Sequence, residues 1–338
     1  MLCLIASEAA AQAAQGTVSA ADWKAYREKF VSNGRVIDDA NGGITHSESQ
    51  GYGLLLAFFA GDRASFEAIW TFTRTELLIR DDGLAAWRWD PKASPRISDI
   101  NNATDGDILI AYALGLGGKA WNEPRYTRAG ARIAAAIGER VLARAGGQTM
   151  LLPGAAGFTD KDGATVVNPS YWVFEAFGTL NELAPQYAWN EVFRGGRWLL
   201  DGARFGASQL PSDWVGIGAG GKLAPAPGFP PLFGYNGLRI PLYLLRAGLT
   251  DSQLLGFFRK LWVDTYGGVP AVVEVESGKI METLTDPGYR MLAASLACAL
   301  DGAPIEASLK LFRPTQYYPS TLHLLALALV SEKYPRCL

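Results

Sequence analysis

The sequence has few of the side chains that bind transition metals. Its 338 residues include two histidines, His46 and His323, and three scattered cysteines, Cys3, Cys298 and Cys337. None of these residues has the spacing of a zinc or iron–sulfur site. We therefore expect no metal and no other cofactor, and any catalysis should depend on carboxylates.

Positive charge is not in excess either. The 31 Lys and Arg residues are matched by 33 Asp and Glu, which gives a net charge of -2 and an isoelectric point near 5.8. A chain with this balance does not neutralise a phosphate backbone, so nucleic acid is excluded as a partner. No segment reaches the roughly 18 uncharged apolar residues of a membrane span. We expect a monomer without a membrane span.

Residues 1–15, MLCLIASEAAAQAAQ, combine a short apolar run with small residues. Two Ala-x-Ala matches favour a secretory leader, although Glu8 interrupts it and no Lys or Arg precedes it. The alternative is a frayed tail, and residues 1–19 are predicted to be one or the other. A leader would make the protein secreted or periplasmic. Among the cysteines that would remain, Cys298 lies in an apolar run and is interpreted as a buried free thiol.

Helical periodicity dominates the rest of the chain. Apolar-periodic segments alternate with breaks rich in Gly and Pro, and the alternation typical of strands is scarce. The pattern predicts about twelve helices in six pairs. They are expected at residues 20–32, 47–60, 64–79, 104–116, 124–144, 170–183, 186–203, 235–247, 252–263, 287–300, 304–312 and 320–333.

The longest break, residues 206–233, contains GIGAGGKLAPAPGFPP and is expected to be irregular. Short strands are expected at residues 84–89, 150–152 and 267–275. No shift in composition marks a domain boundary, so residues 20–338 are predicted to form a single all-α domain.

The helix predicted from residue 47 begins with an acid. Ser47 and Gln50 have the spacing of a capping box, which places Glu48 at the first helical position. Burial would raise the pKa of this carboxyl, whereas the helix N-terminus would lower it. The sequence does not decide between these effects, so Glu48 is either a functional carboxyl or a residue that merely complements the helix dipole.

The helix predicted from residue 104 has the same arrangement. Thr104 is predicted to be its N-cap, Asp107 the acid of a capping box, and Asp105 the first helical residue. If the N-termini of inner helices point to the same end of an all-α domain, Asp105 and Glu48 reach one cleft. Paired carboxyls in a cleft are what cleavage of a glycosidic bond requires. The alternative for Asp105 is an ordinary capping residue.

Several of these stretches together resemble glycoside hydrolase family 8, and in particular its bacterial cellulases that accompany cellulose synthase. The similarity covers nearly the whole chain from about Trp23 onward. The stretches are ATDGDILIAYALGLGGKAW (103–121), GRVID (34–38), SESQGYG (47–53), NPSY (168–171), LLPG (151–154) and PSDW (211–214).

The resemblance implies an (α/α)6 barrel of six inner and six outer helices. It also implies an endo-β-1,4-glucanase that cleaves internal bonds of a β-1,4-glucan chain with inversion. The branch it resembles further suggests a link to cellulose biosynthesis and a functional association with a cellulose synthase complex.

Carried over to this chain, the resemblance makes Glu48 the general acid and Asp105 the carboxylate that holds and distorts the sugar at the cleavage point. The usual base of the family is an Asp after Tyr at the head of a later helix, and here that motif reads Tyr235-Asn236-Gly237. An amide can orient a water molecule but cannot take its proton.

Four explanations of Asn236 are open. In the first, another carboxylate, Asp105 or Asp213, serves as the base in place of residue 236. The sequence could carry an engineered base-to-amide change, or the Asn-Gly bond could deamidate to Asp. Finally, the protein could be a retired enzyme that still binds glycan.

Aromatic residues are candidates for substrate contacts. Trp87 and Trp89 alternate along an extended stretch, so only one of them is expected to stack on a sugar. Core packing is the alternative for each substrate-contact candidate. The resemblance adds Tyr171 and Arg239 to the candidates, and Tyr317 and Tyr318 could line the far end of the cleft.

Two other functions remain open at this point. A non-hydrolytic glycan-binding barrel would explain Asn236. The same fold could also hydrolyse xylan, mixed-linkage glucan or chitosan.

Overall fold

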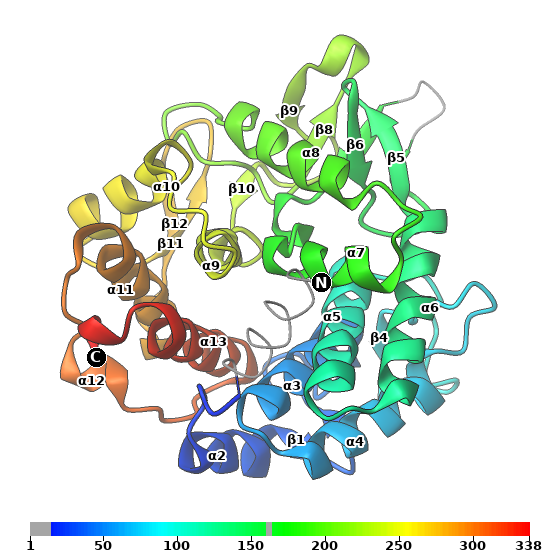
Figure 1. Ribbon diagram of the computed structural model, residues 1–338. Coiled ribbons are helices and arrows are strands. Elements are labelled where there is room, and N and C mark those ends of the chain that lie inside the picture. Colours follow the sequence, from blue (N-terminus) through cyan, green and yellow to red (C-terminus); the bar gives the residue numbers. More distant parts are fainter. Residues whose placement is uncertain (1–14, 160–163) are drawn as a thin grey trace, which may run out of the picture. The chain divides into compact units, whose positions relative to one another are not determined.

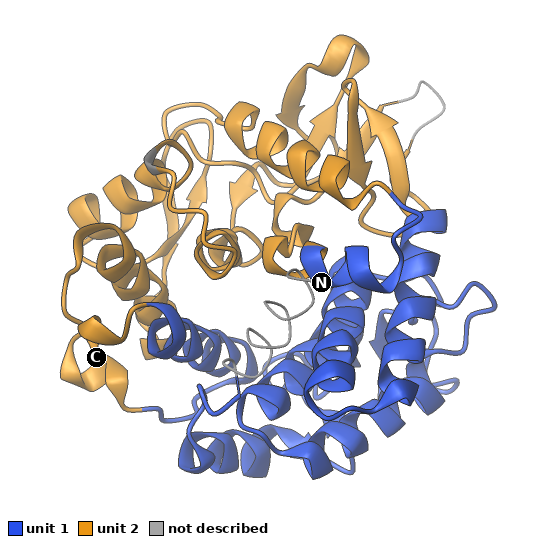
Figure 2. Cartoon of the chain, viewed as in Figure 1, with its two compact units in different colours: residues 1–140, 178–187, 312–333 blue, residues 141–177, 188–311, 334–338 orange. Residues whose placement is uncertain are grey.

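The computed structural model describes residues 15–159 and 164–338, and most of its elements are helices (Figure 1). The predominantly helical chain that the sequence predicts is therefore confirmed. The polypeptide divides into two compact units, which Figure 2 shows in different colours. Unit 1 comprises the described residues up to Arg140, residues 178–187 and residues 312–333, and unit 2 comprises the described remainder. The single domain over residues 20–338 stays a prediction.

The elements of unit 1 are mainly long helices. They are α2 (Ala20–Phe30), α3 (Ser47–Phe59), α4 (Arg63–Phe72), α5 (Thr104–Ala120), α6 (Pro124–Arg140), α7 (Phe177–Leu183, whose first residue belongs to unit 2) and α13 (Tyr317–Lys333), with a π-helical turn, η1 (Thr73–Leu77), after α4. Short strands pair antiparallel, β1 (Val31–Ser32) with β2 (Arg35–Val36) and β3 (Thr45–His46) with β4 (Arg88–Trp89).

Unit 1 contains helices of two kinds. In α3 every residue from Ser49 to Phe59 is buried, and α5 is buried from Thr104 to Gly118. In α4 and α6 the buried residues recur every three or four positions, so only one face is covered. A helix that is apolar on all sides is stable only in an interior. Thus α3 and α5 are inner helices of this unit, packed against each other and against α4 and α6, respectively.

Unit 2 mixes helices with short strands. Its helices are α8 (Trp189–Gly202), α9 (Ile240–Arg246), α10 (Ser252–Arg259), α11 (Pro287–Asp301) and α12 (Ala307–Lys310), with shorter turns η2 (Pro169–Tyr171), η3 (Phe174–Ala176), η4 (Ala219–Gly221), η5 (Gly237–Arg239), η6 (Lys260–Thr265) and η7 (Pro335–Cys337). Its strands are β5 (Leu142–Ala145), β6 (Gln148–Leu151), β7 (Thr165–Val167), β8 (Val215–Ile217), β9 (Leu223–Pro225), β10 (Leu232–Phe233), β11 (Ala271–Glu274) and β12 (Ile280–Thr283).

The prediction that residues 206–233 are irregular is wrong. This segment contains β8, β9 and β10; β8 lies between β7 and β9, and β10 pairs with β11. The partners of β8 and β10 include strands far away in the sequence, so no local pattern reveals the pairing. The strands predicted at residues 84–89, 150–152 and 267–275 are confirmed, because β4, β6 and β11 lie at those positions.

Several predicted helices differ at an end, and two of them show why. The helix expected at 124–144 stops at Arg140, because residues 142–151 form the hairpin of β5 and β6. Its turn is Gly146-Gly147, both with positive φ, and glycine reaches that conformation without a steric cost. The helix expected at 170–183 begins as η2 and η3 and becomes α-helical only at Phe177.

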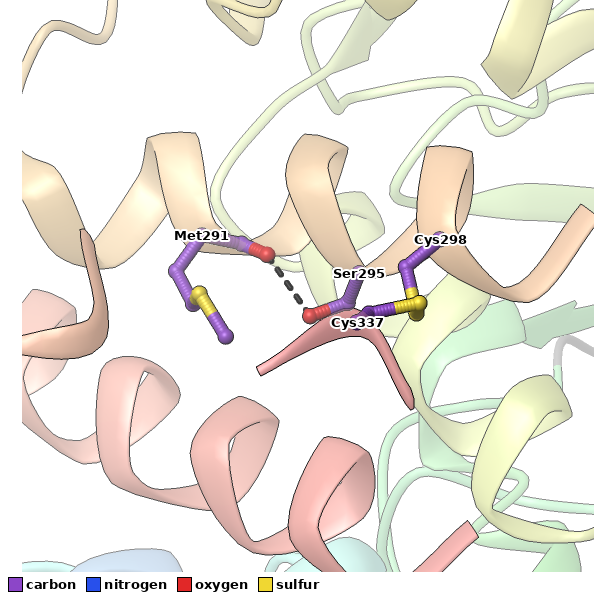
Figure 3. The surroundings of a disulfide bond; sticks show 4 residues. All are labelled: Met291, Ser295, Cys298 and Cys337. Atoms are coloured by element: carbon purple, nitrogen blue, oxygen red, sulfur yellow. Dashed lines mark hydrogen bonds between the residues drawn. A yellow bond between two sulfur atoms is a disulfide. The ribbon is translucent and has the colours of Figure 1, made fainter. Parts of the chain in front are cut away.

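Cys298 is not a free thiol. It forms a disulfide with Cys337, which joins α11 to the C-terminal turn η7 (Figure 3). The Ile305 N–H donates a hydrogen bond of 2.9 Å to the Cys337 carbonyl, so the end of the chain folds back along this part of unit 2. Sequence alone cannot show that fold-back, because it depends on contacts between distant segments.

The prediction of a leader or tail concerns residues 1–19, and residues 1–14 lie outside the described residues. The amides of Gly16 and Val18 both donate to the Phe59 carbonyl, at 2.6 and 3.4 Å. Ser19 caps α2 by accepting the Asp22 N–H at 3.1 Å. Residues 16–19 therefore belong to the folded part of unit 1.

Candidate active site

Glu48 is half-buried at the second residue of α3. The predicted capping box of Ser47 and Gln50 is wrong, because the helix begins one residue earlier than expected and His46 is its N-cap. The Ser49 N–H donates to His46 Nδ1 at 3.1 Å, and the His46 N–H donates to Ser49 Oγ at 3.1 Å. Glu48 thus lies in the first turn, where the helix dipole favours a negative charge.

Gln50 does not cap α3, and its side chain instead forms hydrogen bonds to neighbouring segments. Its Oε1 accepts the Val36 N–H at 2.7 Å, and its Nε2 donates to the Gly34 carbonyl at 3.1 Å and the Ile69 carbonyl at 3.2 Å. A further bond of 3.0 Å runs from Nε2 to Thr73 Oγ1. These buried bonds hold the helix that carries Glu48 against β2, α4 and η1.

Asp105 occupies the equivalent position in α5. The predicted N-cap, Thr104, is instead the first helical residue; Ala103 precedes it without a side-chain cap, and Asp105 is the second helical residue. Asp105 is 1% exposed, and its Oδ1 accepts the Gly106 N–H at 2.8 Å. Both acids therefore start inner helices, as the sequence predicts, but each lies one residue further into its helix.

Asp107 does not form the predicted capping box. Its Oδ1 accepts the Ala85 N–H at 2.8 Å and its Oδ2 accepts Asn102 Nδ2 at 2.9 Å. Burial raises the pKa of Asp107 to about 7, although these two bonds and the charge of Arg80 oppose the rise. Asp107 thus connects α5 by hydrogen bonds to Ala85 and Asn102, which precede the helix.

A close crossing of the backbones brings the starts of α3 and α5 together. A Cβ atom on Gly106 would lie 2.2 Å from Ser47 Oγ and 2.7 Å from the Glu48 backbone nitrogen. One turn further on, a Cβ atom on Gly51 would lie 2.5 Å from Leu109 Cβ. Only glycine permits such an approach. Glu48 and Asp105 are therefore at the same end of neighbouring inner helices of unit 1.

His46 lies among these acids. Its Nε2 is 3.5 Å from Asp38 Oδ2, and its ring meets the edge of Tyr317. Burial lowers the pKa of His46, but the hydrogen bond to Asp38 and the charges of Glu48, Asp38 and Asp105 outweigh it and raise the pKa above its usual value. Nδ1 is occupied by the Ser49 N–H, so the proton of the neutral ring lies on Nε2, toward Asp38.

A second polar cluster lies in unit 2 around Asp213. Its Oδ1 accepts the N–H groups of Gly234 and Gly237, each at 2.9 Å, and Asn236 Nδ2 is 3.4 Å from its Oδ2. Burial raises the pKa of Asp213 even though these groups, together with the Asn236 N–H, oppose the rise. Asp213 therefore lies at the N-terminal end of η5 and α9 and is a stronger proton acceptor than a free aspartate.

Arg239 connects this cluster to the NPSY motif. Its side chain is buried, and its Nη2 donates to Asn236 Oδ1 at 3.3 Å and to Ser170 Oγ at 3.1 Å. Ser170 Oγ in turn donates to Asn168 Oδ1 at 2.8 Å, while the guanidinium lies over the Tyr171 ring. Four predicted residues, Asn236, Asp213, Tyr171 and Arg239, thus gather in unit 2.

Trp87 and Trp89 have different surroundings, as their alternation suggests. Trp89 is 8% exposed, and guanidinium groups of Arg35 and Arg96 lie 4.9 and 4.7 Å from its ring centre. Trp87 is half-buried, and its carbonyl accepts the Ser47 N–H at 3.0 Å. Trp87 is therefore adjacent to the start of α3 and has more ring surface available for a sugar.

Tyr317 and Tyr318 differ in the same way. Tyr317 is fully buried, with its ring against Phe30 and His46, whereas Tyr318 is half-buried. Among the described residues the Tyr317 hydroxyl has no hydrogen-bond partner. Tyr317 therefore packs beneath His46, and Tyr318 is the better candidate for a sugar contact.

The sequence profile described as "Glycosyl hydrolases family 8" matches residues 2–332. The chain belongs to glycosyl hydrolases family 8. The "Probable endoglucanase" of Novacetimonas hansenii is 37% identical over 310 residues, which are 90% of this chain and 89% of that protein.

Solved family 8 structures agree over nearly the whole length. Endoglucanase Cel10 of Klebsiella pneumoniae is 33% identical, with a TM-score of 0.84 over 93% of this chain and 99% of that one. Endo-β-1,4-glucanase CMCax of Acetobacter xylinum is 36% identical, with a TM-score of 0.84 over 94% of this chain and 99% of that one. The chain is accordingly a glycoside hydrolase, as the resemblance implies.

The structure adds residues to each of the two polar clusters that the sequence did not name individually: His46 and Asp38 to the cluster of unit 1, and Ser170 to that of unit 2. His46, Asp38 and Ser170 each contact a predicted residue or the helix that carries it. His46 directly precedes Ser47 and Glu48 in the sequence, which could have drawn attention to it. Asp38 and Ser170 lie in the GRVID and NPSY stretches, but their contacts with His46 and Arg239 had no signal in the sequence.

Within residues 15–159 and 164–338, no group of three or more His, Cys, Asp and Glu side chains is arranged to hold a metal ion. In the same residues, no helix has the length and apolar character needed to cross a membrane.

Proposed function

We propose that this family 8 chain is an endo-β-1,4-glucanase that hydrolyses internal bonds of a β-1,4-glucan with inversion. The observation that carries the proposal is the glycine crossing of α3 and α5, which puts the carboxyls of Glu48 and Asp105 on neighbouring helix starts. The substrate follows from the relatives named above, which are endoglucanases at 33–37% identity.

Glu48 is proposed as the general acid. Its carboxyl is half-buried in the first turn of α3, and the close crossing at Gly106 places that turn next to the start of α5, which carries Asp105. A protonated Glu48 can donate to the glycosidic oxygen as the bond breaks. Asp105 is proposed to hold and distort the sugar at the point of cleavage by accepting its hydroxyl groups.

Asp213 is proposed as the base in place of Asn236. An inverting reaction needs a carboxylate that takes a proton from water. Asp213 Oδ1 is occupied by two backbone N–H groups, whereas its Oδ2 faces Asn236 Nδ2 at a longer distance of 3.4 Å. Its raised pKa also suits a general base better than that of a free aspartate. Asp105 is the weaker candidate, because the proposal already assigns its carboxylate to the sugar at the point of cleavage.

The proposal also covers the fold, the location of the protein and its biological role. The pairing of inner with outer helices in unit 1 and the TM-scores to family members support the (α/α)6 barrel. The Cys298–Cys337 disulfide supports export to the periplasm or the medium, because such bonds persist in oxidising compartments. A role in cellulose synthesis alongside a synthase complex is proposed only on the resemblance of the sequence motifs, such as SESQGYG and NPSY, to that branch of the family.

The test compares the native chain with Glu48→Gln on two kinds of substrate. On carboxymethylcellulose, kcat should fall by about 10²–10⁴-fold, because an amide cannot protonate the leaving oxygen. On an aryl β-cellobioside whose phenolate leaves without protonation, the loss should be much smaller. Viscosity and reducing-end assays measure the first rate, absorbance measures the second, and NMR of the first-formed anomer reports inversion.

Xylan, mixed-linkage glucan and chitosan serve as competing substrates in the same assays. A higher kcat/KM on one of them would replace cellulose as the proposed substrate. Binding of cello-oligosaccharides without turnover of any substrate would favour the glycan-binding alternative. Equal losses for Glu48→Gln on both substrates would contradict its role as the acid.

A further inference from the structure

Asn236 lies between two charged groups of opposite sign. Its Nδ2 faces Asp213 Oδ2 at 3.4 Å, and its Oδ1 accepts Arg239 Nη2 at 3.3 Å. A carboxylate accepts hydrogen bonds only, and a guanidinium donates only. An amide satisfies both neighbours at once, because it carries a donor at one end and an acceptor at the other.

Asp213 and Arg239 are each held in place by further hydrogen bonds. The Gly234 and Gly237 amides bind Asp213 Oδ1, so rotation of the carboxylate is restrained and Oδ2 is the oxygen presented to Asn236. Arg239 is 1% exposed and also donates to Ser170 Oγ at 3.1 Å. The amide therefore completes a continuous chain of polar contacts from η2 to Asp213.

A carboxylate at position 236 would fit only one of these neighbours. It could accept from Arg239, but its second oxygen would lie against Asp213 Oδ2. Two carboxylates that share a site do not both ionise readily, and one of them keeps a proton into a higher pH range. The protonated form would still donate to Asp213 as the amide does, whereas the ionised form would repel it.

We propose that Asn236 is a positioning residue whose amide fixes the orientation of the Asp213 carboxylate, and that it is not a disabled base. The inference rests on the proposed function, in which Asp213 is the base. It explains how a family 8 chain can carry an amide at position 236 and remain an active hydrolase. The amide is then part of the catalytic arrangement, and restoring an acid there disturbs it.

Other groups near this cluster that can carry charge come from several elements. Arg239 belongs to η5 and Tyr171 to η2, while the Tyr235 hydroxyl donates to both oxygens of Glu282 on β12 at 2.9 Å. Each of them is present in every variant considered below. A change in pH profile that follows substitution of residue 236 therefore reports on the contact of that residue with Asp213.

The experiment measures kcat and KM on carboxymethylcellulose between pH 4 and 8 for the native chain, Asn236→Asp and Asn236→Leu. Leucine keeps the size but removes both polar contacts, so kcat should fall about tenfold at every pH with KM nearly unchanged. For Asn236→Asp, activity should approach the native value at low pH and fall relative to it as pH rises. If residue 236 were the base, the activity of Asn236→Asp relative to the native chain would instead rise with pH.

Three controls accompany these variants. Asn190→Asp adds the same charge to an exposed position of α8 and should leave the pH profile unchanged. Thermal unfolding of each variant separates lost orientation from lost folding. Mass spectrometry of the native chain verifies that Asn236 has not deamidated.

The possible outcomes are distinct. If Asn236→Asp exceeds the native activity and gains further as pH rises, residue 236 is a disabled base and the inference is overturned. Native kcat in Asn236→Leu, or native activity in Asp213→Asn, would also overturn it. The proposed function is tested separately, because it fails if the native chain does not hydrolyse β-1,4-glucan or if Glu48→Gln remains fully active, whatever the result at residue 236.

Discussion

At the scale of single residues, Asp107 shows how burial changes a carboxyl without making it catalytic. It is fully buried, its two oxygens accept from Ala85 and Asn102, and its pKa is raised to about 7. An unfolded chain releases this proton near pH 4. Between about pH 4 and pH 7 the folded chain therefore binds one proton more than the unfolded chain. Through this residue alone, the free energy of unfolding falls as pH rises, by up to about 1.4 kcal/mol per pH unit.

Asp107→Asn should remove this dependence. The amide stays neutral, and rotation of Asn102 can keep a hydrogen bond between the two side chains. We expect the melting temperature of Asp107→Asn, relative to the native chain, to rise steadily from pH 5 to pH 7.5 in calorimetric scans. The exposed Asp81 provides the control substitution, Asp81→Asn, whose melting temperature should follow that of the native chain. Parallel curves for Asp107→Asn and the native chain would contradict the buried titration.

At the scale of elements, the crossing of α3 and α5 sets the spacing of Glu48 and Asp105. Gly106→Ala would force its methyl group into Ser47 and the backbone of Glu48. Overpacking of this kind costs about 1–3 kcal/mol of stability. Separating the two helix starts should also lower kcat on carboxymethylcellulose.

The matched control is Gly178→Ala in α7, an exposed site where an added Cβ meets nothing within 4 Å. There alanine should be neutral or stabilise by up to about 1 kcal/mol, because it favours the helix. Thermal unfolding and the carboxymethylcellulose assay measure both variants. If Gly106→Ala kept the native melting temperature and kcat, the backbone crossing would not constrain the acids.

Helices α3 and α5 show which structural features could be predicted from the sequence. Their apolar periodicity and leading acids are local, so each helix and its acid could be predicted. Which residue caps each helix could not, because His46 is selected by Ser49 and by its contact with Asp38 on another segment. The strands within residues 206–233 were missed for a similar reason, since their partners are distant in sequence. The arrangement of Asn236 between Asp213 and Arg239 also depends on such contacts.

At the scale of the whole molecule, the disulfide between Cys298 and Cys337 ties the end of the chain to α11. The two residues are 39 positions apart, and closing a loop of that length stabilises a fold by about 4 kcal/mol in the chain-entropy model. The bond also excludes two thiols from any catalytic role. An oxidising compartment would preserve it.

The double substitution Cys298→Ala with Cys337→Ala should therefore lower the free energy of unfolding by about 2–4 kcal/mol. Denaturant titrations measure the loss, and a reducing agent should lower the stability of the native chain but leave that of the double variant unchanged. The kcat of the folded double variant should be native, because neither cysteine contacts the proposed catalytic residues. Equal stability of both proteins without reductant would indicate that the bond does not form in solution.

The contact at Gly106 also limits how this protein could be engineered. The spacing between the two acid-bearing main chains is set by peptide atoms that already touch, so repacking nearby side chains offers little room to adjust it. Attempts to move the working pH should instead change the charged groups around the two acids, such as His46 and Asp38, whose side chains are 15% and 13% exposed. Engineering would therefore keep the packing of α3 against α5 and change the charged residues near the two acids.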